Sequence, residues 1–296
     1  MASVPSLTLK SGPAMPKTAY GTGTVWFKNG GTDVHRQTVD AIKVAIELGY
    51  RHFDCAEMYG TERELGIALA ESEIPRADVF LTTKTTNIED VEAALESSLS
   101  KLDTSYVDLF LIHSPFPATS PKQLQTAWTM MERCVERGLA RYIGVSNHAI
   151  PHLQSILSTA AIKPAINQIE MHPYLQQPEL LAYMRAANIP FAGYASLTPL
   201  RQRLSKNVEE VLAHLAAAHR VNESAVLVRW VLDQGASAVV TTSGNRDRLE
   251  GYLKSVSAFT LNSEEVAEIS HVSRDTHFRG FFADEFRSLE AGKSSW

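Results

Sequence analysis

Short apolar runs alternate with longer helical segments along almost the whole chain, and this alternation restricts the fold more than any other feature. The clearest run, Leu109–Ile112, is apolar throughout, which suits a parallel strand covered on both faces. The expected strands are Thr18–Gly21, His52–Cys55, Val79–Lys84, Val107–His113, Tyr142–Ser146, Ala165–Glu170, Phe191–Ser196 and Ala238–Thr242.

The stretches between these runs repeat apolar residues at helical spacing. The first, from Asp33 or Val34 to Leu48, places Val39 and Ile42 on one face and stops before Gly49, a residue that suits a helix C-terminus. The other expected helices span residues 90–102, 121–138, 150–157, 178–187, 208–219 and 223–234.

Eight strands alternating with helices form either a closed barrel or a doubly wound sheet. A doubly wound dinucleotide-binding sheet carries G-x-G-x-x-G after its first strand, and Gly21-Thr22-Gly23 lacks the third glycine. We therefore predict one (β/α)₈ TIM barrel domain over residues 1–296, with its core at about 15–260. Residues 261–296 are expected to line part of the substrate pocket, and a hairpin of Val4–Leu9 and Pro16–Ala19 to plug the barrel floor.

The charge balance and the cysteines exclude several classes of protein. Lys and Arg total 28 against 33 Asp and Glu, so the basic surplus of a nucleic-acid binder is missing. No apolar stretch approaches the roughly 20 residues that cross a bilayer, and the N-terminus is not a secretory signal. Cys55 and Cys134 form no disulfide framework, and Cys55 is expected to be buried. We predict a monomeric, cytoplasmic protein with a small-molecule substrate and neither a nucleic-acid nor a membrane partner.

Titratable side chains stand where three of the predicted strands end. Asp54, Lys84 and His113 end strands, and Tyr59 lies in the loop after Asp54. Because reactive groups of such barrels sit at the carboxyl ends of strands, these four are expected to converge. A phenol with a pKa near ~10 needs its anion stabilised, and the Lys84 ammonium, held by Asp54, would lower that pKa. With His113 directing the substrate oxygen, this set predicts general-acid catalysis by Tyr59.

Six segments carry a family resemblance. GYRHFDCAEMYGTERELG (49–66), LTTK (81–84), DLFLIH (108–113), YIGVSN (142–147), NQIEMHPYLQQ (167–177) and TTSGNRDR (241–248) resemble, in the same order, motifs of the aldo-keto reductase family. The resemblance covers nearly the whole chain. It implies a reductase that passes hydride from a nicotinamide cofactor to a carbonyl, with Asp54, Tyr59, Lys84 and His113 as its catalytic tetrad.

The same resemblance implies a cofactor site. Ser146, Asn147 and Gln168 are similar to the residues that grip the nicotinamide carboxamide, a task that suits amides because they donate and accept. Tyr194 resembles the aromatic residue that stacks on the nicotinamide ring. The remaining expected cofactor contacts are Thr24, Ser196 and Leu197, together with Thr242, Ser243 and Arg248 at the adenosine 2′-phosphate.

The chain departs from the usual family pattern at the phosphate site. Thr241-Thr242 replaces the common Pro-Lys, and Arg246 is a possible substitute cation. Further along, Gly251-Tyr252 stands where many members have Glu-Asn in contact with the adenine. We expect NADP(H) rather than NAD(H). The Thr-Thr-Ser start and the later His277-Phe278-Arg279 resemble the fungal branch that reduces conjugated polyketones, ketopantoyl lactone and α-keto amides.

The expected substrate pocket also differs from that of sugar reducers. Ser114 follows the catalytic histidine where those enzymes commonly have Trp, and His148 stands where an aromatic residue is frequent. Trp26, Phe116 and Phe278 are expected to supply apolar walls. We expect a compact activated ketone (an α-keto lactone, amide or ester, or a diketone) or an aldehyde as substrate.

Two other functions fit the same fold. One is a catalytically silent regulatory protein that binds the cofactor, because a barrel does not fix its function. The other is an enone reductase, a chemistry associated with Glu at the position of His113. A metal site is not expected, since Glu170 and His172 have no third ligand at a recognisable spacing.

Overall fold

The computed structural model describes residues 6–8, 14–28, 31 and 33–292. Eight parallel strands close into a barrel in the order β3-β4-β5-β6-β7-β8-β9-β10, and β10 pairs with β3 to complete it. This confirms the predicted fold class. The barrel strands are β3 (Thr18–Gly21), β4 (His52–Asp54), β5 (Phe80–Thr85), β6 (Val107–Ile112), β7 (Ala140–Ser146), β8 (Asn167–Glu170), β9 (Phe191–Tyr194) and β10 (Ala238–Thr241).

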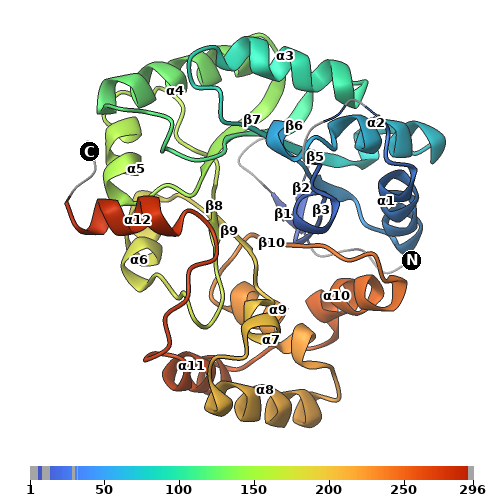
Figure 1. The fold of residues 1–296 in the computed structure, drawn as a ribbon, viewed down its shortest axis with the longest axis vertical. Helices are drawn as coiled ribbons and strands as arrows, with labels where there is room; N and C mark the ends of the chain where they lie inside the picture. Colours follow the sequence, from blue (N-terminus) through green and yellow to red (C-terminus); the bar gives the residue numbers. More distant parts are fainter. Residues whose placement is uncertain (1–5, 9–13, 29–30, 32, 293–296) are drawn as a thin grey trace.

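Helices surround the barrel on all sides in Figure 1. Half of the α-helices of the described residues begin at a residue whose side chain caps them: the Asp90 and Ser120 side chains, for example, accept hydrogen bonds from the backbones of Ala93 and Gln123. The α-helices are α1 (Arg36–Leu48), α2 (Glu62–Glu71), α3 (Val91–Leu102), α4 (Pro121–Glu136), α5 (Ile150–Leu157), α6 (Pro178–Ala187), α7 (Thr198–Gln202), α8 (Lys206–His219), α9 (Glu223–Asp233), α10 (Arg246–Ala258), α11 (Ser263–Val272) and α12 (Ala283–Glu290). The described residues also form three short 3-10 helices: η1 (Thr24–Trp26), η2 (Glu57–Tyr59) and η3 (Arg76–Asp78).

No helix of the described residues is long and apolar enough to cross a membrane.

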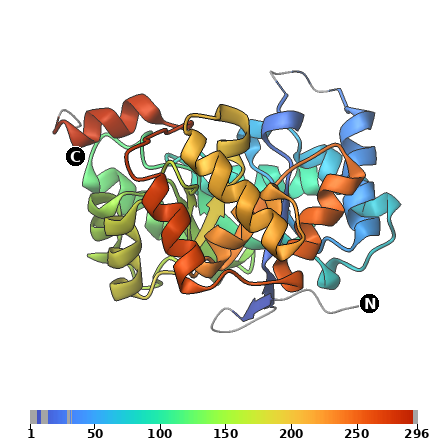
Figure 2. The same ribbon diagram turned by 90° about the horizontal axis from the view of Figure 1, so that it is seen from below.

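A hairpin lies at the N-terminal end of the barrel, on the side away from α12 (Figure 2). Its strands are β1 (Ser6–Thr8) and β2 (Ala14–Pro16), so the predicted second strand at Pro16–Ala19 was wrong. Thr18 and Ala19 pair with β10 instead and belong to the barrel wall. Met15 is fully buried among side chains of the barrel floor, including Leu109 and Leu111. Residues 4, 5 and 9 of the predicted hairpin lie outside the described residues.

Several predicted boundaries need correction. The strand expected to reach Ser196 ends at Tyr194, because Ala195 turns the backbone into the left-handed region at φ 58°. The first helix begins at Arg36 rather than at Asp33 or Val34. Its end before Gly49 is confirmed, and Gly49 adopts φ 102°.

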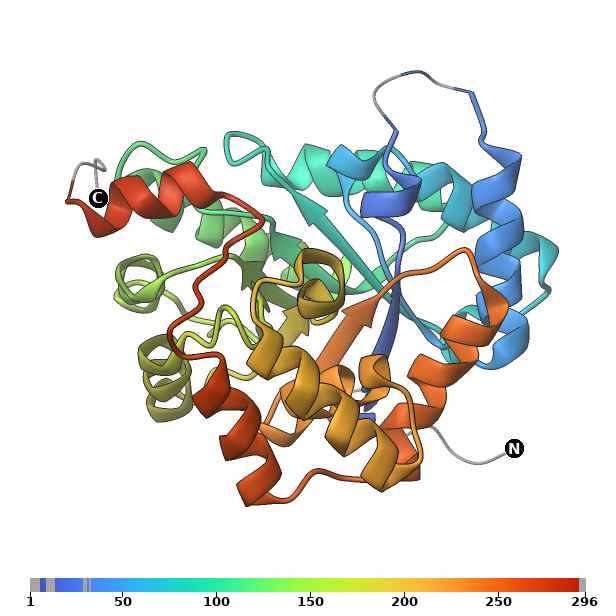
Figure 3. The ribbon, with the colours of Figure 1, turned by 60° about the horizontal axis from the view of Figure 1, so that its bottom comes forward.

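The carboxyl ends of the barrel strands open at the opposite end from the hairpin. The segment between α11 and α12 crosses this end beside β8 and β9 (Figures 1 and 3). We call residues 277–282 of this segment the C-terminal strap. The mouth of the barrel is therefore bordered by strand ends and by a strap that comes from the last part of the chain.

Candidate active site

A buried ion pair forms the base of the mouth. Lys84, on β5, is fully buried, and its Nζ lies 2.5 Å from Oδ1 of Asp54 at the end of β4. The same ammonium donates a 3.0 Å hydrogen bond to the Cys55 carbonyl. Burial works against the charged ammonium, but Asp54 together with Tyr59 outweighs it, and the pKa of Lys84 is raised. Lys84 is therefore held charged inside the barrel.

Tyr59 lies directly above this pair, at the end of η2. Its Oη is 3.4 Å from Nε2 of His113, and the Lys84 ammonium is 5.1 Å from the centre of its ring. Strands β4, β5 and β6 are neighbours, which is why residues far apart in sequence meet here. A side chain at Gly23 would place its Cβ 3.0 Å from the Tyr59 ring, so glycine is what allows this approach. The structure thus brings all four predicted catalytic residues together.

The electrostatics of Tyr59 differ from the expectation. We predicted that Lys84 would bring the pKa of the phenol below its usual value. Burial instead raises the pKa of Tyr59, and the Lys84 charge offsets only part of that effect. The phenol stays protonated at neutral pH, as a proton donor must be, and Lys84 is placed to stabilise the anion once the proton has left.

His113 is buried and neutral. Burial, followed by the repulsion of Lys84, lowers its pKa to about 3. Its backbone N–H donates to the Thr85 carbonyl, which fixes the residue just beyond the end of β6. A neutral imidazole keeps one N–H to donate and one nitrogen to accept, so His113 can orient an oxygen without adding charge.

A hydrogen-bond network joins the expected nicotinamide residues to the tetrad. The Tyr194 hydroxyl donates to Oδ1 of Asn147 at 2.7 Å, and Asn147 Nδ2 donates to the His113 carbonyl at 2.9 Å. Ser146 Oγ donates to the Gln168 carbonyl at 2.8 Å, and Gln168 Nε2 donates to Oδ2 of Asp54 at 2.8 Å. The structure brings these four residues to the same side of the mouth.

Hydroxyl groups without partners follow the ends of β9 and β10. Ser196 Oγ and Thr242 Oγ1 are buried atoms with no hydrogen-bond partner among the described residues. Such orphaned groups are costly unless a ligand satisfies them, and they suit the oxygens of a dinucleotide cofactor. Leu197 is half-buried next to Ser196, whereas Thr24 is exposed at the start of η1. These residues fit a nicotinamide dinucleotide.

The expected 2′-phosphate residues lie at the start of α10. Ser243 Oγ accepts a hydrogen bond from the Asn245 backbone, and Arg248 is exposed on the first turn of the helix. Arg246, considered above as a substitute cation, is paired with Glu47 of α1 at 2.9 Å. Of the two arginines at the start of α10, Arg248 is therefore the one with no carboxylate within 4.0 Å among the described residues.

The expected substrate-pocket residues do not all face the mouth. Phe116 is half-buried and packs against Phe282 and Phe286 of the C-terminal segment, with ring centres 5.5 and 5.1 Å apart. Ser114 is almost fully buried beside His113. His148 has no exposed surface, and its Nδ1 forms a hydrogen bond with the Ser146 carbonyl. It therefore supports the residues that line the mouth and does not line the mouth itself.

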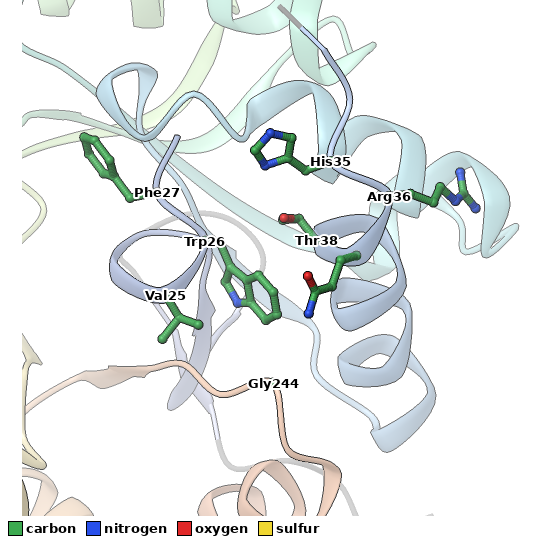
Figure 4. A pocket seen from close by; sticks show the side chains of 8 residues that line it. Val25, Trp26, Phe27, His35, Arg36, Thr38 and Gly244 are labelled. Atoms are coloured by element: carbon green, nitrogen blue, oxygen red, sulfur yellow. The ribbon is translucent and has the colours of Figure 1, made fainter. Parts of the chain in front are cut away.

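Trp26 and Phe278 complete the expected substrate-pocket residues. Trp26 lines a cavity of about 490 Å³ between η1, the start of α1 and Gly244 (Figure 4). It is Phe27 that reaches the Tyr59 ring, at 6.2 Å between centres. Phe278 belongs to the strap itself, and its ring packs near His172 at 6.3 Å between ring centres.

Sequence reasoning missed the role of Glu170. Its carboxylate is buried and accepts hydrogen bonds from His172 Nε2 at 2.9 Å and from the backbone N–H groups of Gly280 and Phe281. Glu170 thus ties the C-terminal strap to the end of β8. The sequence signal was its place two residues after Gln168 on the same strand face, which we considered only for metal binding.

Comparison with known proteins agrees with this geometry. The sequence profile of the aldo/keto reductase family matches residues 19–274. The NAD/NADP-dependent indole-3-acetaldehyde reductase of Schizosaccharomyces pombe is 36% identical over 91% of this chain and 96% of its own length. The NADPH-dependent alpha-keto amide reductase of Saccharomyces cerevisiae is 36% identical over 90% of this chain and 89% of its own. Both relatives are fungal, as the Thr-Thr-Ser segment led us to expect.

Solved structures show the same fold. An aldo/keto reductase from Brucella melitensis superposes with a TM-score of 0.80 and 32% identity, covering 91% of this chain and all of its own. A Bombyx mori aldo-keto reductase in complex with NADP superposes with a TM-score of 0.83 and 30% identity, covering 96% of this chain and 98% of its own.

Proposed function

The chain belongs to the aldo/keto reductase family and is an oxidoreductase, and we propose that it is an NADPH-dependent reductase of compact activated ketones or aldehydes. The observation that carries this proposal is the position of the Tyr59 hydroxyl, 3.4 Å from Nε2 of a neutral histidine and above a buried, charged lysine.

The cofactor supplies a hydride to the carbonyl carbon, and the side chains of this chain handle the oxygen. His113 donates a hydrogen bond that aims the carbonyl oxygen at Tyr59. As negative charge develops on that oxygen, Tyr59 transfers its proton, and the Lys84 ammonium stabilises the phenolate that remains. Asp54 keeps Lys84 charged and in place.

The cofactor preference rests on Arg248 and on the relatives. The Saccharomyces cerevisiae relative is named as NADPH-dependent, the Schizosaccharomyces pombe one as using NAD or NADP, and the Bombyx mori structure contains NADP. The exposed Arg248 guanidinium at the start of α10 suits a 2′-phosphate, because it can form two parallel hydrogen bonds with phosphate oxygens.

The substrate class is supported by the walls of the mouth and by the relatives. Phe116 and the strap supply aromatic surface close to the tetrad, and the two fungal relatives are named for an α-keto amide and for indole-3-acetaldehyde. Oxidation of NADPH and NADH is measured against a panel of isatin, ketopantoyl lactone, α-keto esters, simple aldehydes and sugars. Efficient turnover of glucose or xylose, with none of the α-keto compounds, would overturn the proposed substrate class.

A variant separates an enzyme from a silent cofactor-binding protein. Tyr59→Phe removes only the proton donor, and general-acid catalysis contributes about 10²–10⁴ to a rate. We expect a loss of that size with unchanged NADPH binding. Tyr106→Phe is the matched control, because Tyr106 lies between Arg76 and Arg141 next to the barrel floor. Equal activity of the Tyr59 variant and the wild type would refute the proposed role.

We further propose that residues 1–296 form one monomeric domain of cytoplasmic location. The last helices support the single domain, since α11 packs on α8 and α9. Cys55 and Cys134 are both buried free thiols, which persist in a reducing compartment. Sedimentation of the purified protein at micromolar concentration tests the monomer, and a dimer mass would contradict it.

A further inference from the structure

The C-terminal strap is fixed at several points around the mouth. Oε1 of Glu170 accepts from the Gly280 N–H at 2.9 Å, and Oε2 accepts from the Phe281 N–H at 3.1 Å. The Phe278 N–H donates to the Tyr174 carbonyl at 3.0 Å. A buried carboxylate that accepts several N–H groups is a strong anchor, because each bond is charge-assisted. These hydrogen bonds therefore hold the strap in a defined position as one wall of the site.

Aromatic contacts fix the position of the strap on two sides. The Phe281 ring meets the Tyr194 ring edge to face, with centres 5.3 Å apart, on the β9 side. The Phe282 ring packs on Phe116, three residues beyond His113. Phe282 adopts φ 54°, a strained conformation for a bulky residue, which the surrounding contacts must maintain.

Arg279 lies in the middle of this strap with its hydrogen-bond donors unused. Its Cζ is 3.8 Å from the centre of the Phe286 ring, and it is partly buried. No carboxylate lies within 4.0 Å of it and no hydrogen bond engages its guanidinium in the part of the chain that the structure describes. Two other arginines differ: the partly buried Arg76 pairs with Asp108, and the buried Arg229 pairs with Asp233.

An unpaired guanidinium in such surroundings has a physical cost. Burial lowers the pKa of Arg279, and the charges of Glu170 and Glu290 only partly oppose this effect. A guanidinium has five N–H donors, and at this partly buried position a bound oxygen acceptor would form charge-assisted hydrogen bonds with them. The cation–π contact with Phe286 orients the group but satisfies none of these donors.

The strap packs on Tyr194 at one side and on Phe116, just beyond His113, at the other, so a compact substrate over the tetrad has the strap as its neighbouring wall. Strand β8, which carries Glu170, lies opposite β4 in the barrel order, and Gln168 of β8 still reaches Asp54 of β4 at 2.8 Å. Tyr194, which the strap covers at one edge, is bonded through Asn147 to the backbone of His113.

We propose that Arg279 is a specificity-determining residue that hydrogen-bonds a second oxygen of the substrate, next to the carbonyl that is reduced, and that Glu170 is the residue that positions it. The inference rests on the proposed reductase function and deepens it. The chemistry recognised is an oxygen acceptor adjacent to the reacting carbonyl, supplied either by a carboxylate or by a second carbonyl.

Three small aldehydes of similar size test this assignment. Glyoxylate carries a carboxylate next to its aldehyde, methylglyoxal carries a neutral ketone, and propanal carries no second oxygen. For Arg279→Met we expect kcat/KM with the first two to fall about ten- to a hundredfold, mainly through KM, and with propanal to change less than about threefold. Each substrate is compared with itself, so aldehyde hydration cancels. A larger loss for glyoxylate than for methylglyoxal identifies the carboxylate as the preferred acceptor, and equal losses identify the neutral carbonyl as sufficient.

Further variants separate recognition from a general structural effect. Arg287→Met is the matched control, since Arg287 is exposed on α12 and pairs with Asp284. Arg279→Lys keeps the positive charge but lacks the planar guanidinium, which can donate two parallel hydrogen bonds. Compared with Arg279→Met, it should recover part of the activity with glyoxylate. Glu170→Gln should show the same substrate-selective rise in KM and faster amide hydrogen exchange at Gly280 and Phe281.

The role of Arg279 would be overturned if Arg279→Met lost as much activity with propanal as with glyoxylate and methylglyoxal, or lost no activity with any of them. A wild type that reduces propanal but neither glyoxylate nor methylglyoxal would overturn it as well. The proposed function is judged separately, by wild-type turnover that disappears in Tyr59→Phe. Absence of wild-type turnover with every carbonyl tested would overturn that function and this inference together.

Discussion

The Gln168 side chain crosses the barrel mouth and donates a 2.8 Å hydrogen bond to Oδ2 of Asp54. The other oxygen of the same carboxylate holds the Lys84 ammonium at 2.5 Å. One buried carboxylate therefore supports both the amide expected to hold the nicotinamide and the cation expected to stabilise the phenolate. The proton-donating side and the cofactor side of the site share this single support.

Replacing Asp54 should damage stability and catalysis together. Asp54→Asn keeps the shape of the side chain but leaves the buried Lys84 ammonium without its counter-charge. Removal of one partner from a buried ion pair costs about 3–5 kcal/mol of unfolding free energy, which urea denaturation would measure, and we expect kcat to fall about a hundredfold. Asp284→Asn, in an exposed pair with Arg287, is the control and should stay within about 0.5 kcal/mol. A loss below about 1 kcal/mol for Asp54→Asn would contradict the buried-pair interpretation.

Gly23 should tolerate no side chain without a loss of activity. In Gly23→Ala the new Cβ would approach the Tyr59 ring to 3.0 Å and displace the phenol. A shift of about 1 Å in a catalytic group can lower the rate about a hundredfold, so we expect kcat/KM to fall between ten- and a hundredfold. Gly251→Ala on α10 is the comparison: it meets only ordinary contact at 3.4 Å and, with the cofactor saturating, should leave kcat/KM for the carbonyl unchanged. Full activity of the Gly23 variant would show that Tyr59 does not need this approach.

Arg248 should discriminate between the two cofactors. Loss of a hydrogen bond to a charged group costs about 1.5–3 kcal/mol, so Arg248→Ala should weaken NADPH binding about ten- to a hundredfold and leave NADH binding unchanged. Quenching of protein fluorescence by each cofactor measures both dissociation constants. Arg246→Ala should have little effect on either, because Arg246 pairs with Glu47. Equal weakening of both cofactors by Arg248→Ala would place the 2′-phosphate elsewhere.

Three buried histidines should make the fold sensitive to acid. Burial lowers the pKa of His113 and of His148 to about 3 and that of His152 to about 4. Because an unfolded histidine titrates near ~6.5, the unfolded chain binds more protons below that pH, and stability falls from about pH 6.5 downward until the folded groups titrate. At pH 5 each contributes a loss of about 2 kcal/mol. Urea unfolding at pH 7 and pH 5 should show this drop, and His148→Gln should reduce it by about 2 kcal/mol, the contribution of one histidine. The same drop in wild type and variant would refute the assignment to His148.

The comparison between sequence and structure is clearest at the tetrad. Lys84 and His113 were placed from the ends of apolar runs, and the structure brings them beside Asp54 and Tyr59 because parallel strands of a barrel end at one mouth. Such a meeting depends only on which strands are neighbours. The sign of the Tyr59 pKa shift depends on burial, which elements distant in sequence create, and there the sequence-based expectation was wrong.

The sequence by itself determined the barrel, the strand that carries each reactive group and the family motifs. These features depend on apolar runs and on the reactive residues that end them, and both can be recognised from neighbouring positions in the chain. Only the tertiary structure decided that Glu170 anchors the strap, and that Arg279 has no carboxylate partner within the described residues. These two residues are 109 positions apart in the printed chain. Their relationship is set by the packing of the last helices on the barrel, and no local pattern in the sequence encodes it.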